Sequence, residues 1–423
     1  MKVLVTGGTG FIGSNIVSAL KTRGHEVVAC VRDPARARMV LGVEAVACDF
    51  ERDTEPLVWT GRLKGVDAVV NAVGIITERK GATFKALHSK TPKALFEGAQ
   101  KAGVKKIVQI SALGADERAE SRYHLSKKEA DDFLRGLSID WVIVRPSLVF
   151  GKGGASTRLF SALSSLPVIP VFGEGEELLQ PISIEDLSRA VVNILEDESA
   201  KRLTIDAAGG EAITYAQMLS VYRKRLGLGR ARFLKIPMSI ARIIACAGDI
   251  TKTGPLNTET LGMLKRGNAA DISLFKKAAK ADPAPFIDAP PFSRAGRNDA
   301  RLFFTLPVLR LTIALLWICS GLVSLFVFPY AESIELLEET GVPAYLRPGA
   351  LYAASIIDII LGAALLFGYR VRAACIAQML LMLAYTLIIA LRLPVLLIHP
   401  FAPVIKNIVV LSATLAVVSL EEK

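Results

Sequence analysis

The sequence predicts an α/β protein in which a doubly wound parallel sheet with a small C-terminal lobe precedes a four-helix transmembrane bundle. Two observations lead to this prediction. The chain opens with a short apolar run, a glycine-rich turn and an apolar-periodic helix, MKVLVTGGTGFIGSNIVSAL, which is the pattern of a buried parallel strand entering a βα unit. After residue 302, four long apolar stretches follow one another, as expected of membrane-spanning helices.

The first βα turn carries glycine where a pyrophosphate requires it. A helix is expected to begin at about Gly10 or Phe11, directly after the turn. Gly7 permits the tight turn, Gly10 lets the backbone approach the ligand, and Gly13 lets helix and strand pack closely. The helix N-terminus adds free N–H groups and a positive dipole end. We therefore predict a dinucleotide-binding turn, and the alternative is a tight turn without a ligand.

The end of the second predicted strand, residues 25–31, indicates which dinucleotide binds. In this fold class that position meets the adenosine ribose, where a carboxylate suits the 2′-hydroxyl of NAD and an arginine suits the 2′-phosphate of NADP. Arg32 comes first, and Arg36 and Arg38 follow closely. These residues favour NADP(H), although Asp33 keeps NAD(H) possible and a solvated basic loop is the alternative.

Two further predicted strands, 44–48 and 67–71, end in residues that would face the same cofactor. The first ends beside the adenine, and small residues after the second let the backbone lie near the cofactor ribose. The residues concerned are Asp49, Phe50, Ala72, Val73 and Gly74.

A tyrosine and a lysine after the fifth predicted strand, 105–110, form a candidate proton-transfer pair. Tyr123 and Lys127 are four residues apart and therefore share one helix face. A lysine ammonium beside the phenol is expected to lower its pKa toward neutral pH. Ser111, at the end of that strand, could hydrogen-bond the same substrate oxygen. The alternative is two unrelated surface residues.

At this point the chain resembles the extended and atypical short-chain dehydrogenase/reductases. The resemblance covers about residues 1–280 and rests on TGGTGFIG, NAVG, Ser111, YHLSK and RPSLVFG in that order. The later segments VFGEG and QPISIEDL, with Pro255 and Leu256, are most similar to the branch that contains the NADPH-binding accessory subunit of respiratory complex I. The resemblance implies a Rossmann domain that binds NAD(P).

The resemblance also implies a role for individual residues. Tyr123 would be proton donor or acceptor, Lys127 would bind Tyr123 and the nicotinamide ribose, and Ser111 would orient the substrate. Cofactor contacts are implied at Gly7, Gly10, Phe11, Ile12 and Arg32, with Pro146 and Ser147 near the nicotinamide.

Three functions remain open. The first is an oxidoreductase acting on the carbonyl or alcohol of a lipid-soluble substrate such as a quinone, isoprenoid or lipid carbonyl. The second is a structural or assembly protein of a membrane redox complex that holds NADPH without turnover, as the complex I branch implies. The third, a sugar-nucleotide epimerase or dehydratase, is disfavoured because the spacing from Ser111 to Tyr123 is shorter than in the epimerases.

The boundary between the two halves is predicted from composition. Residues 1–280 are predicted to form the nucleotide-binding domain, with a substrate lobe over about 151–280. Within that lobe, the apolar stretch 234–250 is either a core helix or an amphipathic segment that touches a bilayer. We favour the core helix. Residues 281–301 contain four prolines and are typical of a semi-rigid linker. The membrane domain covers 302–423.

The membrane domain is predicted to cross the bilayer four times, at 308–328, 351–367, 371–391 and 393–420. Basic residues before the first span and after the second place the N-terminal domain and the C-terminus in the cytoplasm, in an inner (cytoplasmic) membrane. Asp358 and Lys406 are ionisable residues within spans and could pair, or Lys406 could reach the interface.

This half resembles the DoxX-like four-helix membrane domain, which is linked to quinone or thiol redox work. The matching residues are 317–322, Asp358 with 361–362, 385–386, and 399–403 leading to 406–407.

Composition limits the remaining possibilities. The net charge of +11 is explained more simply by an anionic membrane surface than by nucleic acid, because no recognition motif is present. Five scattered cysteines and four dispersed histidines predict buried thiols and no metal site. No leader-like segment precedes the first strand, so we expect the N-terminal domain to stay where it is made.

Overall fold

The computed structural model describes residues 1–78, 81–251, 257–398 and 404–421. The chain divides into two compact units, Met1–Ala300 and Arg301–Lys423. Two motifs used above, Pro255–Leu256 and the segment 399–403, lie outside the described residues.

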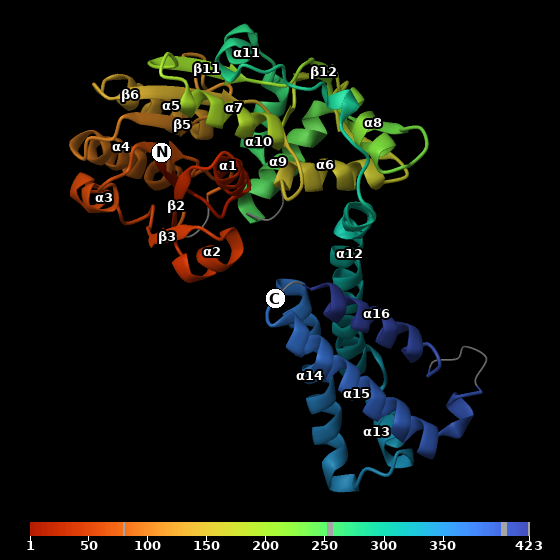
Figure 1. Ribbon diagram of the computed structural model, residues 1–423. Coiled ribbons are helices and arrows are strands. Elements are labelled where there is room, and N and C mark those ends of the chain that lie inside the picture. Colours follow the sequence, from red (N-terminus) through yellow and green to blue (C-terminus); the bar gives the residue numbers. More distant parts are fainter. Residues whose placement is uncertain (79–80, 252–256, 399–403, 422–423) are drawn as a thin grey trace. The chain divides into compact units, whose positions relative to one another are not determined.

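Unit 1 is built on a seven-stranded parallel sheet (Figure 1). The strands in chain order are β1 (Lys2–Thr6), β2 (Glu26–Val31), β3 (Glu44–Ala47), β4 (Ala68–Asn71), β5 (Lys106–Ile110), β6 (Asp140–Pro146) and β11 (Leu203–Ala207). Their order across the sheet is β11-β6-β5-β4-β1-β2-β3. The order reverses between β1 and β4, and ligands of open α/β sheets bind at the carboxyl ends of the strands at such a switch point. The predicted doubly wound parallel sheet is confirmed.

Helices cover both faces of this sheet, which explains the unbroken apolar runs of the strands. Val3 and Val5 face a core shared with α1 (Phe11–Thr22), α7 (Ile184–Glu196) and α11 (Ser273–Ala279). Leu4 faces the opposite core, shared with α3 (Pro56–Arg62), α4 (Thr91–Lys101) and α5 (Arg122–Arg135). A π-helical segment, η1 (Lys85–Lys90), precedes α4 and continues into it. Helix α2 (Pro34–Leu41) packs beside β2 and β3.

A small lobe with its own apolar core completes unit 1. Its helices are α6 (Ala155–Ser165), α8 (Tyr215–Arg225), α9 (Met238–Thr251), α10 (Thr258–Arg266) and the 3₁₀ turn η2 (Phe286–Asp288). Its short strands are β7 (Val149–Phe150), β8 (Ile169–Phe172), β9 (Leu178–Leu179), β10 (Ile182–Ser183), β12 (Ile213–Thr214) and β13 (Phe233–Ile236). Part of the segment predicted as a linker packs on this lobe: Phe286 is fully buried among Phe150 and Tyr222, and Arg225 donates to the Pro290 carbonyl.

Unit 2 consists of apolar helices. They are α12 (Arg294–Leu322) with the π-helical η3 (Val323–Val327), α13 (Tyr330–Glu339), η4 (Ala344–Leu346), α14 (Arg347–Phe367), α15 (Val371–Arg392), η5 (Pro394–Leu396) and α16 (Asn407–Leu420). Three segments are long and apolar enough to cross a membrane, Arg294–Val327, Ala344–Phe367 and Val371–Arg392, and α16 is a shorter apolar helix. The second predicted span is therefore longer than expected, and the described helix within the fourth is shorter.

Close packing in unit 2 depends on small residues between α12 and α14. A Cβ atom at Gly362 would lie 2.8 Å from the Ala314 carbonyl oxygen, so the two backbones nearly touch there. Asp358, on the same helix as Gly362, accepts a hydrogen bond from Ser320 at 3.3 Å. Within the described part of unit 2 this serine contact takes the place of the ion pair with Lys406 that the sequence allowed.

Candidate functional site

The glycine-rich turn after β1 has the shape of a phosphate cradle. Gly7 has φ +66°, and the Gly10 N–H donates to the Gly7 carbonyl at 2.8 Å, which closes the turn. A Cβ atom at Gly13 would overlap the Gly7 carbonyl, so helix α1 can approach the turn only with glycine there. The N-cap of α1 is Gly10, which has no side chain to occupy the first N–H groups. Those donors remain available for an anion.

Buried side-chain hydrogen bonds connect the strand ends at the same edge of the sheet. Thr6 donates to Asn71 at 2.6 Å, and Asn71 donates to Gln109 at 2.7 Å, which links β1, β4 and β5. The predicted residues Ala72, Val73 and Gly74 follow directly. A Cβ atom at Gly7 would lie 3.0 Å from the Ala72 carbonyl oxygen, so the two turns are in contact across the switch point.

Tyr123 and Lys127 lie on one face of α5 beside these turns, as the spacing predicted. Lys127 is only 3% exposed, and its ammonium donates to the carbonyl oxygens of Val73 and Ile110, at 3.1 Å each. Burial lowers the pKa of Lys127 to about 8, although the Asp131 carboxylate opposes this shift. The lysine therefore joins the turn after β4 to the end of β5.

The pKa of Tyr123 moves in the direction opposite to the expectation. Burial raises it to about 12, and the negative charge of Asp131 adds to the increase. The lowered pKa predicted from the neighbouring lysine is wrong, because burial and the Asp131 charge both raise the pKa of the phenol. At neutral pH the phenol keeps its proton and can only donate it.

Asp131 is a site residue that the sequence reasoning missed. It is fully buried one turn beyond Lys127, and the Ser111 hydroxyl donates to its Oδ2. Its Oδ1 has no hydrogen-bond partner among the described residues. Burial raises the pKa of Asp131 to about 6, against the lowering effects of Ser111 and Lys127. Ser111 thus points to a carboxylate in the free protein, and the spacing Tyr-x₃-Lys-x₃-Asp on one helix face was the available signal.

His88 is the second residue that was missed. It lies on η1, it is 1% exposed, and its Nε2 accepts the Ile75 N–H at 3.0 Å. Since a backbone N–H must donate, Nδ1 carries the proton and donates to Ser126 at 2.9 Å. Burial, aided by the Lys127 charge, lowers the pKa of His88 to about 2, so the ring is neutral. Its ring also meets that of Tyr123 edge to face, with centroids 5.5 Å apart. The histidine therefore fixes the turn after β4 and the start of α5.

The remaining predicted residues also follow strand ends at this edge. Ser147 donates to the Gln180 carbonyl at 2.6 Å, and the Pro146 carbonyl accepts the Leu113 N–H at 2.9 Å. Both contacts tie the end of β6 to neighbouring loops. Phe11 lies against the β7–α6 loop, where a Cβ atom at Gly154 would be 3.0 Å from its ring, and the next residue, Ile12, is half-buried.

Of the residues predicted to contact the adenosine, Arg32 is exposed and the others already contact protein groups. Arg32 is exposed at the end of β2, whereas Asp33 caps α2 by accepting the Arg36 N–H at 3.0 Å. Beyond β3, Asp49 accepts the Glu51 N–H at 2.9 Å. The ring of Phe50 packs edge to face on Trp59, 5.5 Å between centroids, and belongs to the core.

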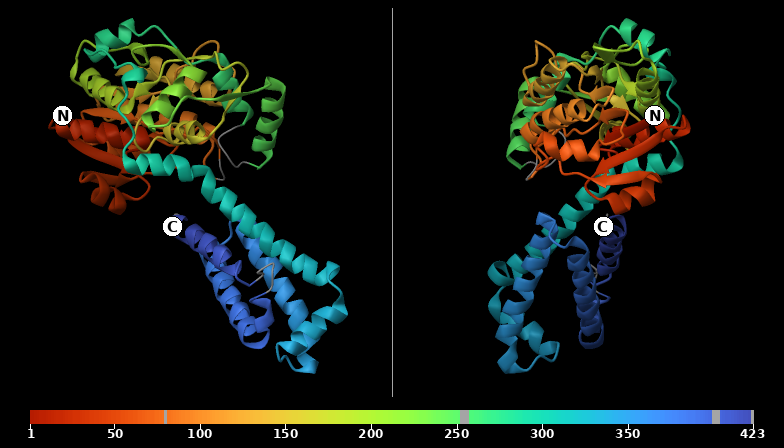
Figure 2. Two further views of the ribbon diagram at one scale, coloured as in Figure 1. Left: turned by 90° about the vertical axis from the view of Figure 1, so that its right-hand side faces the viewer. Right: turned by 60° about the vertical axis from the view of Figure 1, so that its left-hand side comes forward.

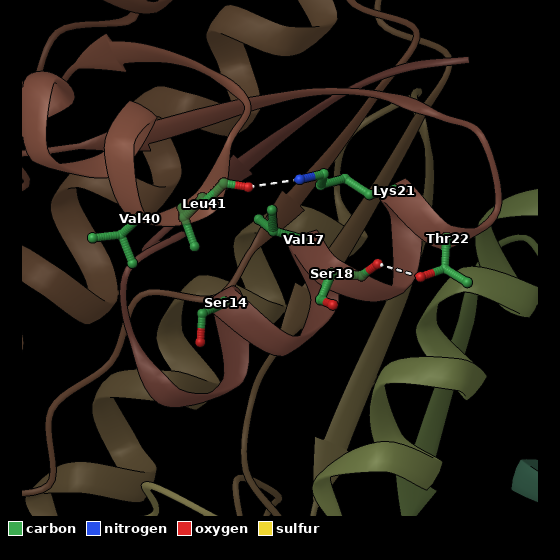
Figure 3. Close-up of a pocket in the computed structure, with 7 residues that line it drawn as sticks. All are labelled: Ser14, Val17, Ser18, Lys21, Thr22, Val40 and Leu41. Carbon is green, nitrogen blue, oxygen red and sulfur yellow. Dashed lines mark hydrogen bonds between the residues drawn. The ribbon is translucent and has the colours of Figure 1, made fainter.

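One pocket of about 340 Å³ lies apart from these residues, between α1 and α2 (Figure 3). Lys21 donates to the Leu41 carbonyl at 2.7 Å across its rim. The pocket is lined by Ser14, Val17, Ser18, Lys21, Thr22, Val40 and Leu41. It shares no residue with the predicted site.

The strand-end residues fit a dinucleotide. Gly7 and Gly13 let the turn, the neighbouring loop and α1 pack backbone to backbone, and the N-cap Gly10 leaves the first N–H groups of α1 without a side-chain partner. Lys127 supplies a buried cation at the far end of the same edge. This is the donor set that a pyrophosphate and a ribose require.

Comparison with known proteins agrees with both halves of the chain. A family model described as NAD(P)H-binding matches residues 7–198, and the DoxX-like family matches residues 314–415. A ceramide reductase of Caulobacter vibrioides is 27% identical over 247 residues, which cover 56% of this chain and 73% of that protein. The 40 kDa subunit of NADH-ubiquinone oxidoreductase from Neurospora crassa is 26% identical over 247 residues, covering 57% of this chain and 64% of that subunit.

Solved structures share the fold of unit 1. The NADPH-dependent quinone oxidoreductase of Escherichia coli in complex with NADPH superposes with a TM-score of 0.55 at 18% identity, covering 71% of this chain and 99% of that one. The chain therefore consists of an NAD(P)-binding Rossmann domain with homologues among complex I subunits and a C-terminal DoxX-like domain.

Proposed function

We propose that the chain is a membrane-anchored, NADP(H)-dependent oxidoreductase that acts on the carbonyl or alcohol of a lipid-soluble substrate. The observation that carries the proposal is the grouping of Tyr123, Lys127, Ser111 and Asp131 beside the glycine cradle. A proton donor, a buried cation and an acid–hydroxyl pair at the switch point are what carbonyl reduction requires of the protein.

The residues divide the chemistry as follows. A bound NADP(H) supplies or accepts the hydride. Tyr123, protonated at neutral pH, gives its proton to the substrate oxygen, and the Lys127 ammonium stabilises the phenolate that remains. Ser111 holds the substrate oxygen once its hydroxyl turns from Asp131.

The preference for NADP(H) rests on the end of β2. Arg32 is exposed there and can meet a 2′-phosphate. Asp33, which would suit the 2′-hydroxyl of NAD, is already engaged as the N-cap of α2.

A lipid-soluble substrate is supported by the membrane-spanning half and by a relative. The chain is a membrane protein, with three candidate spans and a shorter apolar helix. The Caulobacter relative is named a ceramide reductase, which makes a lipid carbonyl the first class to test, with quinones next. From the distribution of basic residues we infer that unit 1 and the C-terminus face the cytoplasm in an inner membrane.

A second function has its own support: a structural or assembly role in a membrane redox complex, with NADPH held but not turned over. The Neurospora relative is a complex I subunit.

The experiment that tests the proposal starts from the full chain purified in detergent. Bound nucleotide is released by denaturation and identified, and NADPH oxidation is followed after adding ceramide-type ketones, lipid aldehydes or membrane quinones. Oxidation that is lost in Tyr123→Phe, but kept in a control at the exposed Tyr345 (Tyr345→Phe), is the expected result. NADPH that stays bound and unreacted with every compound would reject the proposal in favour of the structural role.

A further inference from the structure

Helix α9 presents its large apolar side chains to solvent. Ile240, Ile243 and Ile244 are 48%, 70% and 44% exposed, and their spacing of three and four residues places them on one face. In Figure 2 this green helix stands at the edge of unit 1. Monomeric soluble proteins rarely expose such a continuous apolar strip without a partner.

The contacts that hold α9 involve its small residues instead. Ala241 and Ala245 are fully buried against Leu261 of α10, with Phe172 and Met238 beside them. The core position favoured for residues 234–250 is therefore wrong for the isoleucine face. Because α9 buries alanine and exposes isoleucine, its packing in unit 1 removes little apolar surface from water and stabilises the helix little.

The strand that leads into α9 exposes further apolar side chains. Phe233 and Leu234 of β13 are 37% and 59% exposed, and as neighbours in a strand they point to opposite sides. This strand pairs with β8 in parallel register, and Pro237 joins it directly to α9. We call the isoleucine strip of the helix the α9 face: Ile240, Ile243 and Ile244.

The charge around the α9 face has one sign along the chain. Residues 212–248 contain seven lysines and arginines and no aspartate or glutamate. The exposed basic residues are Lys224, Arg230, Arg232, Lys235 and Arg242. Acidic groups also come near: Glu174 pairs with Lys235, Glu176 acts on the same lysine through its charge, and Asp249, on the last turn of α9, accepts the Thr258 N–H at 3.3 Å.

We propose that the α9 face lies in the surface of the bilayer that the chain's own apolar helices enter, with the flanking basic residues on anionic headgroups. Apolar side chains with arginine and lysine at their margin are the composition of interfacial helices. Unit 2 of the same chain carries the candidate spans, so unit 1 is tethered to a bilayer. A protein partner would more often bring aromatic anchors and pairing acids and bases than a strip of isoleucine in a segment rich in lysine and arginine.

Contact of the α9 face with the bilayer would give unit 1 a membrane-binding role that is independent of any reaction at the nucleotide site. A nucleotide domain held flat on the bilayer can receive a substrate from the lipid without releasing it to water. This inference does not depend on the proposed reaction, since the same contact would serve a structural role.

Site-directed fluorescence in the full chain tests the contact. In a background with the exposed Cys246 and Cys319 replaced by serine, Ile243→Cys is labelled with an environment-sensitive dye. The matched control is Leu57→Cys on α3, which is 84% exposed. Both proteins are placed in nanodiscs of phosphatidylcholine with phosphatidylglycerol, and are compared using spin-labelled lipid and aqueous iodide as quenchers.

The proposal expects the dye at residue 243 to be quenched several-fold more by spin-labelled lipid than the dye at residue 57, and to be protected from iodide. Equal iodide quenching at the two positions would overturn it. Protection from iodide without lipid quenching would also overturn it, because a second copy or a protein partner would then cover the face. Unchanged nucleotide content in both labelled proteins shows that the substitutions leave the fold of unit 1 intact.

Discussion

Removing the Lys127 ammonium should destabilise unit 1 mainly through the carboxylate it leaves behind. Lys127 is 3% exposed and Asp131 is fully buried one helical turn away. Lys127→Met keeps most of the side-chain volume and removes the charge. Leaving a buried charge without compensation costs about 3–5 kcal/mol. Lys127 is not in direct ion-pair contact with Asp131, but its positive charge favours that carboxylate, and it is the donor to the Val73 and Ile110 carbonyls. We expect a loss of this size in the free energy of unfolding.

The same reasoning predicts that a second substitution restores stability. Asp131→Asn removes the stranded charge but keeps an acceptor for the Ser111 hydroxyl. Replacing both partners of a buried pair by neutral groups is often close to neutral. Lys127→Met with Asp131→Asn should therefore be more stable than Lys127→Met alone by about 2 kcal/mol or more.

The assay uses the full chain in detergent without added nucleotide, so that lost cofactor contacts do not enter. Trp59 and Trp141 report on unit 1, and Trp317→Phe silences the tryptophan of unit 2. For a unit of this size each kcal/mol shifts the thermal midpoint by roughly 2 °C, so Lys127→Met should lower it by about 5–10 °C. A midpoint within about 1 °C of the parent protein, or a double variant less stable than the single one, would refute the coupling of the two charges.

Three further predictions address the cofactor and the carboxyl. Gly13→Ala places a Cβ on the Gly7 carbonyl, so NADPH affinity measured by titration should fall by roughly tenfold to a hundredfold, whereas Gly61→Ala, where a Cβ meets nothing within 4 Å, should leave it unchanged. Arg32→Ala should weaken NADPH at least several-fold more than NADH, and equal weakening would contradict the assignment of the 2′-phosphate contact. Because burial raises the pKa of Asp131 from 3.8 to about 6, its contribution to stability is present below pH 4 and is lost as the pH rises to about 6; Asp131→Asn should remove that decline from a series of unfolding midpoints.

Local patterns predicted the architecture well because they are set by short-range physics. The apolar run Val3–Val5 is stable only if both faces of the strand are buried. The glycines that follow allow backbone segments to approach one another closely. The four-residue spacing from Tyr123 to Lys127 places both side chains on one helix face. These inferences depend only on short segments of the chain. They were sufficient to predict the parallel sheet, the glycine-rich turn and the shared helix face of Tyr123 and Lys127.

What the sequence could not supply depends on burial. The pKa of Tyr123 rises because the surrounding segments desolvate it, and no spacing rule measures that effect. His88 contacts Ile75 and Ser126 from a π-helical segment, a geometry without a sequence signature. The isoleucines of α9 were assigned to the core because apolar residues are usually buried, whereas the alanines of that helix take the buried side.

The buried imidazole has a consequence for reading any future pH profile. His88, with a pKa of about 2, stays neutral throughout the range in which enzymes are assayed, and burial also lowers the pKa of the adjacent His124 to about 4. An inflection between pH 5 and 8, usually assigned to a histidine, would here belong to Asp131 or Lys127. Histidine-modifying reagents would therefore act on this site through damage to packing, and the titrating groups would be identified by carboxyl and amine chemistry.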